Sequence, residues 1–240
     1  MKKATLILFI FIPILTFGQQ NLVADSSTYL TAIKNDLQVK WSKNRTINLV
    51  FHGHSVPSGY FRTPVVNTLG AYPHLVLKDI KQQYPYAVIN TIVTAIGGEN
   101  AERGAKRFDA DVLSLKMDVL FIDYSLNDRN IGLERAYKAW DEMVKKALAK
   151  GVKVILLTPS PDTKVDFSNP DNELAKHAAQ VRKLAAENNV GLADSYKAFE
   201  FLFSNKTEIE KYMSQTNHPN ELGHALIATE IMKWFNFKAI

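Results

Sequence analysis

The sequence predicts a three-layer α/β/α domain built on a parallel sheet of five strands. Three observations predict this fold. Apolar runs alternate with amphipathic segments five times, each run is continuously apolar, and three of the runs are followed by polar residues or glycines. Continuous apolar strands are typical of a parallel sheet that is covered on both faces. Alternation of strands and helices, with right-handed crossovers, places helices on both sides of such a sheet.

The first predicted strand, residues 47–51, is apolar and β-branched, and it breaks at Gly53 before a polar turn that carries Ser55. Four later segments have the same apolar, β-rich character. The five predicted strands cover residues 47–51, 86–95, 117–123, 152–157 and 190–193.

Helices are predicted wherever apolar residues recur at helical spacing. The second helix is expected to break or bend near Gly70 and Pro73, and the fourth to end before Gly151. The predicted helices cover residues 24–42, 64–83, 99–115, 133–149, 172–188, 196–203 and 222–235. A long polar loop leads from the fourth strand to Pro170.

Composition bounds the class of protein. The chain has 240 residues, 46% hydrophobic and 22% charged, which suits one domain with a real core. The net charge is +5, but the lysines and arginines are scattered among acidic residues and form no basic stripe. Nucleic acid is therefore not an expected partner. There is no cysteine, and therefore neither a disulfide framework nor a lipid-modified cysteine.

The first 18 residues have the pattern of a secretory signal peptide. Lys2 and Lys3 precede an apolar run over residues 4–17, and Gly18 is a small residue near a cleavage site. The run is shorter than the roughly 20 residues that span a bilayer, and Pro13 interrupts it. We expect cleavage, no stable membrane insertion, and a periplasmic or secreted protein. Residues 19–45 then form an N-terminal segment with a peripheral helix, followed by the main domain over residues 46–240.

Chemistry-bearing residues follow three of the strands and precede the last helix. Strand carboxyl ends share one edge in a parallel sheet, so Ser55, Gly98 and Asn127 are expected to meet there, with His218 nearby. A hydroxyl, an imidazole and hydrogen-bond donors for an oxyanion are what acyl transfer requires. Each residue also has a structural alternative: Ser55 as a cap, Gly98 as a turn, Asn127 in an Asx-turn, His218 at a helix start.

Four blocks resemble those of the SGNH or GDSL-type esterases and lipases. The resemblance spans about residues 47–235 and is carried by Gly53-His54-Ser55, Gly98, Asn127-Asp128 and His218-Pro219-Asn220-Glu221-Leu222-Gly223-His224. It implies a flavodoxin-like sheet and ester hydrolysis with neither a metal nor an organic cofactor. By position, Ser55 would be the nucleophile and His218 the general base. The oxyanion hole would consist of the Ser55 and Gly98 N–H groups and the Asn127 amide.

Three positions depart from the family pattern. His54 stands where the family has Asp, Ser125 where Gly is usual, and Gln215 where an acid normally precedes the histidine by three residues. An acid there fixes the imidazole tautomer, and its replacement by an amide can cost about 10⁴-fold in kcat. We therefore predict a Ser55–His218 dyad, oriented by Gln215 or by a backbone carbonyl. Glu221 and Asp194 are alternative carboxylates.

Tyr60, Arg62 and Arg129 are predicted at the rim of the substrate pocket, because they follow the nucleophile turn and the oxyanion asparagine. His54 is expected either in a solvent-side loop or in contact with the leaving group. His177 is expected on a helix surface.

The predicted function is a secreted serine esterase that removes acetyl or other short acyl groups from carbohydrate. The alternatives are a lipase, lysophospholipase or thioesterase, or a catalytically weakened relative that binds a glycan or acylated ligand. The expected partner is a small-molecule or glycan ester, and the oligomeric state stays open.

Overall fold

The computed structural model describes residues 22–204 and 208–236, so the predicted signal peptide lies outside the described residues. Five parallel strands form the main sheet in the order β2-β1-β3-β4-β5. Their bounds are β1 Thr46–Gly53, β2 Val88–Val93, β3 Val119–Asp123, β4 Lys153–Leu157 and β5 Gly191–Ala193. The strand order is that of flavodoxin-like doubly wound sheets, which confirms the predicted fold class.

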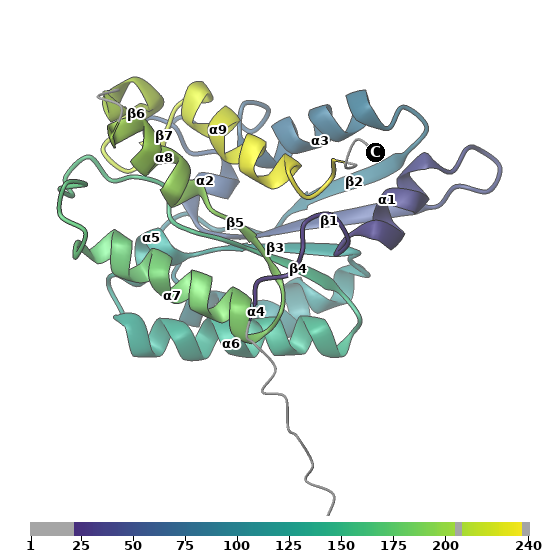
Figure 1. The fold of residues 1–240 in the computed structure, drawn as a ribbon, viewed down its shortest axis with the longest axis horizontal. Helices are drawn as coiled ribbons and strands as arrows, with labels where there is room; N and C mark the ends of the chain where they lie inside the picture. The colour runs from purple at the N-terminus through teal and green to yellow at the C-terminus, as the bar shows by residue number, and fades with distance from the viewer. Residues whose placement is uncertain (1–21, 205–207, 237–240) are drawn as a thin grey trace, which may run out of the picture.

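Helices cover both faces of the sheet (Figure 1). On one face lie α1 Thr31–Gln38, α3 Tyr72–Gln83, α8 Ser195–Ser204 and α9 Glu221–Met232. On the other lie α4 Ala101–Asp111, α6 Leu133–Ala149 and α7 Glu173–Glu187. Shorter elements are α2 Ser55–Ser58, α5 Ser125–Asp128, the 3₁₀ turns η1 Leu113–Leu115 and η2 Ile209–Tyr212, and the antiparallel pair β6 Met213–Gln215 and β7 His218–Pro219.

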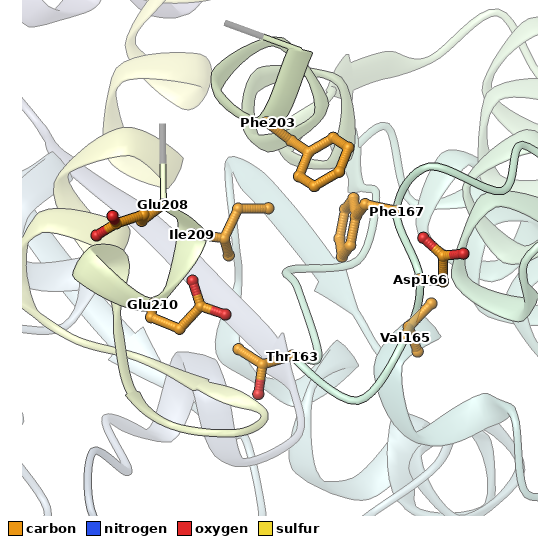
Figure 2. A pocket seen from close by; sticks show the side chains of 8 residues that line it. All are labelled: Thr163, Val165, Asp166, Phe167, Phe203, Glu208, Ile209 and Glu210. Carbon is orange, nitrogen blue, oxygen red and sulfur yellow. The ribbon is translucent and has the colours of Figure 1, made fainter. Parts of the chain in front are cut away.

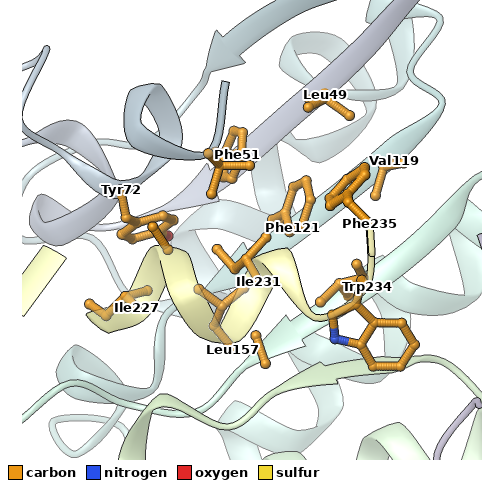
Figure 3. Packing of buried hydrophobic residues seen from close by; sticks show 14 of the residues in the cluster. Leu49, Phe51, Tyr72, Val119, Phe121, Leu157, Ile227, Ile231, Trp234 and Phe235 are labelled. Carbon is orange, nitrogen blue, oxygen red and sulfur yellow. The ribbon is translucent and has the colours of Figure 1, made fainter. Parts of the chain in front are cut away.

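Two hydrophobic clusters explain why the strands are apolar throughout. Phe51 of β1 and Phe121 of β3 stack at 4.3 Å between ring centroids in the cluster under α9 (Figure 3). Their neighbours Val50 and Ile122 belong to the other cluster, together with residues of α4 and α6. Successive side chains of a strand point to opposite faces, so burial of both faces removes the alternation of polar and apolar residues.

The predicted helix over residues 64–83 is wrong in its first half. In the structure α3 begins at Tyr72, and Pro73 lies in its first turn, where a missing N–H breaks no helical hydrogen bond. Val65 and Leu69, which suggested an apolar helical face, are 59% and 77% exposed in the turns before it. The β6–β7 pair was not predicted.

The peripheral helix α1 is shorter than predicted and is part of the core. Leu30, Ile33 and Leu37 are buried in the same cluster as the residues of α9. The described part of the N-terminal segment therefore packs on the domain. Among the described residues, no helix is both long and apolar enough to cross a membrane. The same residues contain no group of three or more His, Cys, Asp or Glu side chains that could hold a metal ion.

Candidate active site

The nucleophile turn follows directly from the end of β1. His54 caps the short helix α2 by accepting a hydrogen bond at Nδ1 from the Val56 N–H, 3.2 Å away. Gly53 has no room for a side chain, because a Cβ there would overlap the Asp123 carbonyl oxygen and come within 2.8 Å of Pro57. This close approach of β1 to β3 presents Ser55 at the carboxyl edge of the sheet.

Ser55 and His218 are brought together as predicted from the sequence. His218 Nε2 lies 2.9 Å from Ser55 Oγ, and His218 Nδ1 lies 2.8 Å from the carbonyl oxygen of Phe61. A carbonyl can only accept, so Nδ1 carries the proton and the lone pair of Nε2 faces the serine hydroxyl. Burial lowers the pKa of His218, so the neutral imidazole that a general base needs is favoured.

The Phe61 carbonyl is fixed by the segment around it. The Phe61 ring stacks on His224 with centroids 4.9 Å apart, and the Phe61 N–H donates to the Val65 carbonyl oxygen at 3.1 Å. Two residues later, the Thr63 N–H donates to Gln215 Oε1 at 3.0 Å. Gln215 therefore acts on this segment and not on the imidazole.

None of the three side chains predicted as orienters contacts His218 among the hydrogen bonds of the described residues. The amide nitrogen of Gln215 donates to Asn217 Oδ1 at 3.2 Å. Glu221 accepts from Asn67, and Asp194 is paired with Arg182. Of the alternatives that the sequence left open, the geometry favours the backbone carbonyl.

The predicted oxyanion donors differ in exposure: Ser55 is buried, Asn127 is half-buried and Gly98 is exposed. The Asn127 amide donates one N–H to the Glu99 carbonyl oxygen at 2.9 Å, which leaves its second N–H for a ligand. Gly98 has a φ of +75°, a conformation that favours glycine, and a Cβ there would meet nothing within 4 Å. Within the described residues, the N–H groups of Ser55 and Gly98 have no acceptor, as an oxyanion hole requires.

A buried ion pair lies next to these donors, and sequence reasoning missed it. Glu99, 3% exposed, accepts from Arg107 Nε at 3.0 and 3.1 Å and from the Tyr124 hydroxyl at 2.9 Å. His52 Nε2 lies 3.1 Å from the same hydroxyl, and its ring is fully buried. The side chain of Glu99 is thus anchored in the core while its carbonyl oxygen holds the Asn127 amide.

His54 is not a rim residue, contrary to both interpretations made from the sequence. Its ring is fully buried, and its Nε2 lies 3.3 Å from Asp123 Oδ1 without hydrogen-bond alignment. The other Asp123 oxygen accepts from the Tyr72 hydroxyl at 3.1 Å. His54 therefore supports the turn that carries Ser55 from within the core.

Asp128 fixes the turn that carries Asn127, the predicted oxyanion donor next to it. Its two oxygens accept from the Ala101 N–H at 2.8 Å and from Trp140 Nε1 at 2.7 Å. Burial raises the pKa of Asp128 to about 6, and both hydrogen bonds oppose this rise. The carboxyl thereby ties α5 to the start of α4 and to α6.

Tyr60, Arg62 and Arg129 lie around the dyad in different ways. The Tyr60 ring centroid lies 6.1 Å from that of His218. Arg62 is exposed near Ser214, whereas Arg129 is held by an ion pair with Asp162 at 2.7 Å. Tyr60 and Arg62 are therefore the freer rim groups.

His177 was expected on a helix surface and is instead 4% exposed. Burial, and then the charge of Arg129, lower the pKa of His177 to about 4. His177 is buried because α7 packs against α5, and this packing also brings Arg129 close to His177.

The fold recurs in solved structures of carbohydrate esterases. An acetylxylan esterase from Geobacillus stearothermophilus matches with a TM-score of 0.70 and 20% identity, over 80% of this chain and 95% of that chain. A two-domain esterase active on acetylated mannans, co-crystallised with mannopentaose, matches with a TM-score of 0.71 and 22% identity, over 88% of this chain and 55% of that chain. A second acetyl xylan esterase matches with a TM-score of 0.63 and 24% identity, over 77% of this chain and 98% of that chain.

No curated protein matches the chain. A model of the GDSL-like lipase/acylhydrolase family, however, matches residues 51–226, which include all four sequence blocks. Because this match covers most of the chain and spans the hydrogen-bonded serine and histidine, the chain belongs to the GDSL-like lipase/acylhydrolase family and is a carboxylic ester hydrolase.

Proposed function

We propose that the protein is a secreted serine esterase that removes acetyl or other short acyl groups from glycans through an acyl-enzyme at Ser55. The observation that carries the mechanism is the pair of hydrogen bonds made by His218, 2.9 Å to Ser55 Oγ and 2.8 Å to the Phe61 carbonyl oxygen. Together they give a base of the required tautomer that faces a hydroxyl at the ligand edge of the sheet.

The chemistry proceeds in two halves. Ser55 Oγ attacks the ester carbonyl carbon as its proton passes to His218 Nε2, and the resulting oxyanion is stabilised by the N–H groups of Ser55 and Gly98 and by the Asn127 amide. Collapse of the tetrahedral intermediate expels the alcohol, which takes the proton from His218. Water then attacks the acyl-enzyme with His218 as base, and the carboxylic acid and free Ser55 are released.

The glycan part of the proposal is supported by the activities of the proteins with similar structures. The similar structures described above are esterases of acetylated xylan and acetylated mannan. The rim of the dyad carries Tyr60, an aromatic ring beside a catalytic imidazole, which can cover the apolar face of a sugar.

Labelling with a fluorophosphonate probe tests the serine mechanism. We expect stoichiometric labelling of the intact protein, lost in Ser55→Ala and strongly reduced in His218→Ala. Acetylated xylan and mannan should release acetate, and p-nitrophenyl acetate should be cleaved faster than the longer-chain esters. A preference for long chains would favour the lipase, lysophospholipase or thioesterase alternative. Neither labelling nor turnover at high protein concentration would favour a ligand-binding relative.

Secretion rests on the pattern of residues 1–18. Expression of the full chain in a Gram-negative host should yield a mature protein outside the cytoplasm. Its N-terminal sequence should begin shortly after Gly18. Retention of Met1 in a cytoplasmic product would contradict this part of the proposal.

A further inference from the structure

A cavity of about 370 Å³ lies between residues 163–167 of the loop after β4 and a second wall formed by Phe203 and residues 208–210. Its size falls within the range of small-ligand sites in proteins. The first wall belongs to the loop that leaves the carboxyl end of β4, which is the edge of the sheet where Ser55 lies. Figure 2 shows Phe167 and Phe203 at one end of this cavity, with Ile209 across from them.

The loop that forms the first wall of the cavity contacts residues close in sequence to His218 and to Asn127. The Thr163 N–H donates to the Thr216 carbonyl oxygen at 2.7 Å, two residues before His218. The neighbouring Asp162 carboxylate binds Arg129 at 2.7 Å, two residues after Asn127. The stretch that forms one wall of the cavity is therefore held against both halves of the site. A ligand in the cavity would lie at a fixed position relative to Ser55.

The apolar end of the cavity offers aromatic surface. Phe203 is 40% exposed, although its side chain is large and apolar. Its ring centroid lies 6.2 Å from that of Phe167, at an interplanar angle of 40°. Phe167 is in turn stacked on Tyr196 at 5.2 Å, which fixes its ring from behind. The two rings form an apolar surface suited to the C–H face of a sugar ring.

The charged groups that line the cavity are all acidic. Asp166, Glu208 and Glu210 lie around it, and no lysine or arginine is among its lining residues in the described part of the chain. Lys211, outside the lining, pairs with Glu208 at 3.3 Å. Hydrogen bonds from Ser168 lower the pKa of Asp166, which keeps that carboxylate ionised. Carboxylates accept hydrogen bonds from hydroxyl groups and repel anions. This lining favours a neutral polyhydroxy ligand over an acidic sugar or a phospholipid.

We propose that this cavity is a subsite for a neutral sugar residue of the oligosaccharide whose ester is bound at Ser55. The inference rests on the proposed glycan esterase function and extends it by naming where the chain of the glycan is held. Binding energy from a subsite remote from the reacting bond can raise kcat/KM for the longer substrate.

Phe203→Ala tests the subsite, with Phe201→Ala as the matched control. Phe201 is exposed on the same helix and does not line this cavity. For Phe203→Ala we expect kcat/KM on acetylated oligosaccharides to fall about tenfold, the equivalent of losing one partly buried aromatic contact. Activity on p-nitrophenyl acetate and on acetylated monosaccharides should stay at the wild-type level. Phe201→Ala should match the wild type on every substrate.

Binding to Ser55→Ala separates this inference from the proposed function. In calorimetric titrations of that variant with deacetylated xylo- and manno-oligosaccharides, we expect binding that Phe203→Ala weakens about tenfold. An inactive wild-type enzyme that still binds these sugars in the cavity would overturn the esterase proposal and leave the subsite standing. Equal losses on p-nitrophenyl acetate and oligosaccharides, no difference between the two phenylalanine variants, or binding of lysolipid instead of sugar would overturn the subsite.

Discussion

The two sides of the candidate active site are built from different kinds of interaction. On the oxyanion side, Asn127 is held by the carbonyl of Glu99, whose carboxylate is buried against Arg107. On the base side, the partner of His218 is a neutral carbonyl on a surface segment. A carbonyl selects the imidazole tautomer but adds no full negative charge to stabilise the imidazolium. The comparison indicates that Asn127 is held by a residue whose side chain is anchored by charge, while the base is oriented without charge.

Among the groups that support the Ser55–His218 dyad, removal of a donor from the anchored side should have the largest effect. For Asn127→Ala we expect kcat to fall about 10²- to 10³-fold, as for loss of one oxyanion-hole donor elsewhere, with a smaller change in KM. Steady-state kinetics on p-nitrophenyl acetate measure this fall, and Asn130→Ala, three residues later and exposed, is the control. A fall confined to KM would show that Asn127 binds the ground state instead.

Loss of the Glu99 carboxylate should have the next largest effect. Glu99→Gln removes the buried carboxylate that pairs with Arg107 and leaves the guanidinium only the exposed carboxylate of Asp111. We expect the free energy of unfolding to fall by about 1–3 kcal/mol. Because the same residue holds Asn127 through its carbonyl, kcat should also fall, by about tenfold. Denaturant unfolding and kinetics on one preparation measure both quantities.

Glu102→Gln is the matched control for this anchoring charge. Glu102 pairs with Arg135 at the surface, close to Glu99 in sequence, and its loss should leave stability and kcat at wild-type levels. A destabilised Glu99→Gln with unchanged kcat would make the buried ion pair purely structural.

The base side can be followed by pH. Burial, with a further contribution from the charge of His54, lowers the pKa of His218 below 6.5, and the Phe61 carbonyl opposes this shift. The active form is neutral, so kcat/KM should be constant above pH 7 and fall only as pH drops through the lowered pKa. A pH–rate profile with circular dichroism at each pH separates this from unfolding. A midpoint at or above 7 would indicate a negative charge beside the imidazole.

Acid should also destabilise the fold itself. Burial lowers the pKa of both His52 and His224 to about 3. The stability that these neutral rings contribute is fully present above pH 6.5 and is lost as pH falls towards 3. The midpoint of denaturant unfolding, measured from pH 7 to pH 4, should therefore decline steadily. A flat profile would contradict the burial of these two rings.

The sequence predicted the strands and the meeting of Ser55 with His218, but not how each is supported. Strands buried on both faces are continuously apolar, and parallel topology then brings their carboxyl ends together. The partner of His218 is a backbone oxygen, and no side-chain type at Phe61 signals that role. The Glu99–Arg107 pair joins a loop to a helix eight residues on, a contact that depends on how the loop folds.

The smallest expected effect concerns the position where the family has its acid. Gln215 Oε1 holds the Thr63 N–H near the Phe61 carbonyl, and no hydrogen bond joins Gln215 to His218 among the described residues. For Gln215→Asp we expect kcat to be unchanged or to fall a few-fold, about the value of one neutral hydrogen bond. Asn217→Ala, which removes the partner of the Gln215 amide nitrogen, should change kcat less. A rise in kcat would mean that a carboxylate can displace the carbonyl, and that the base side was limited by missing charge.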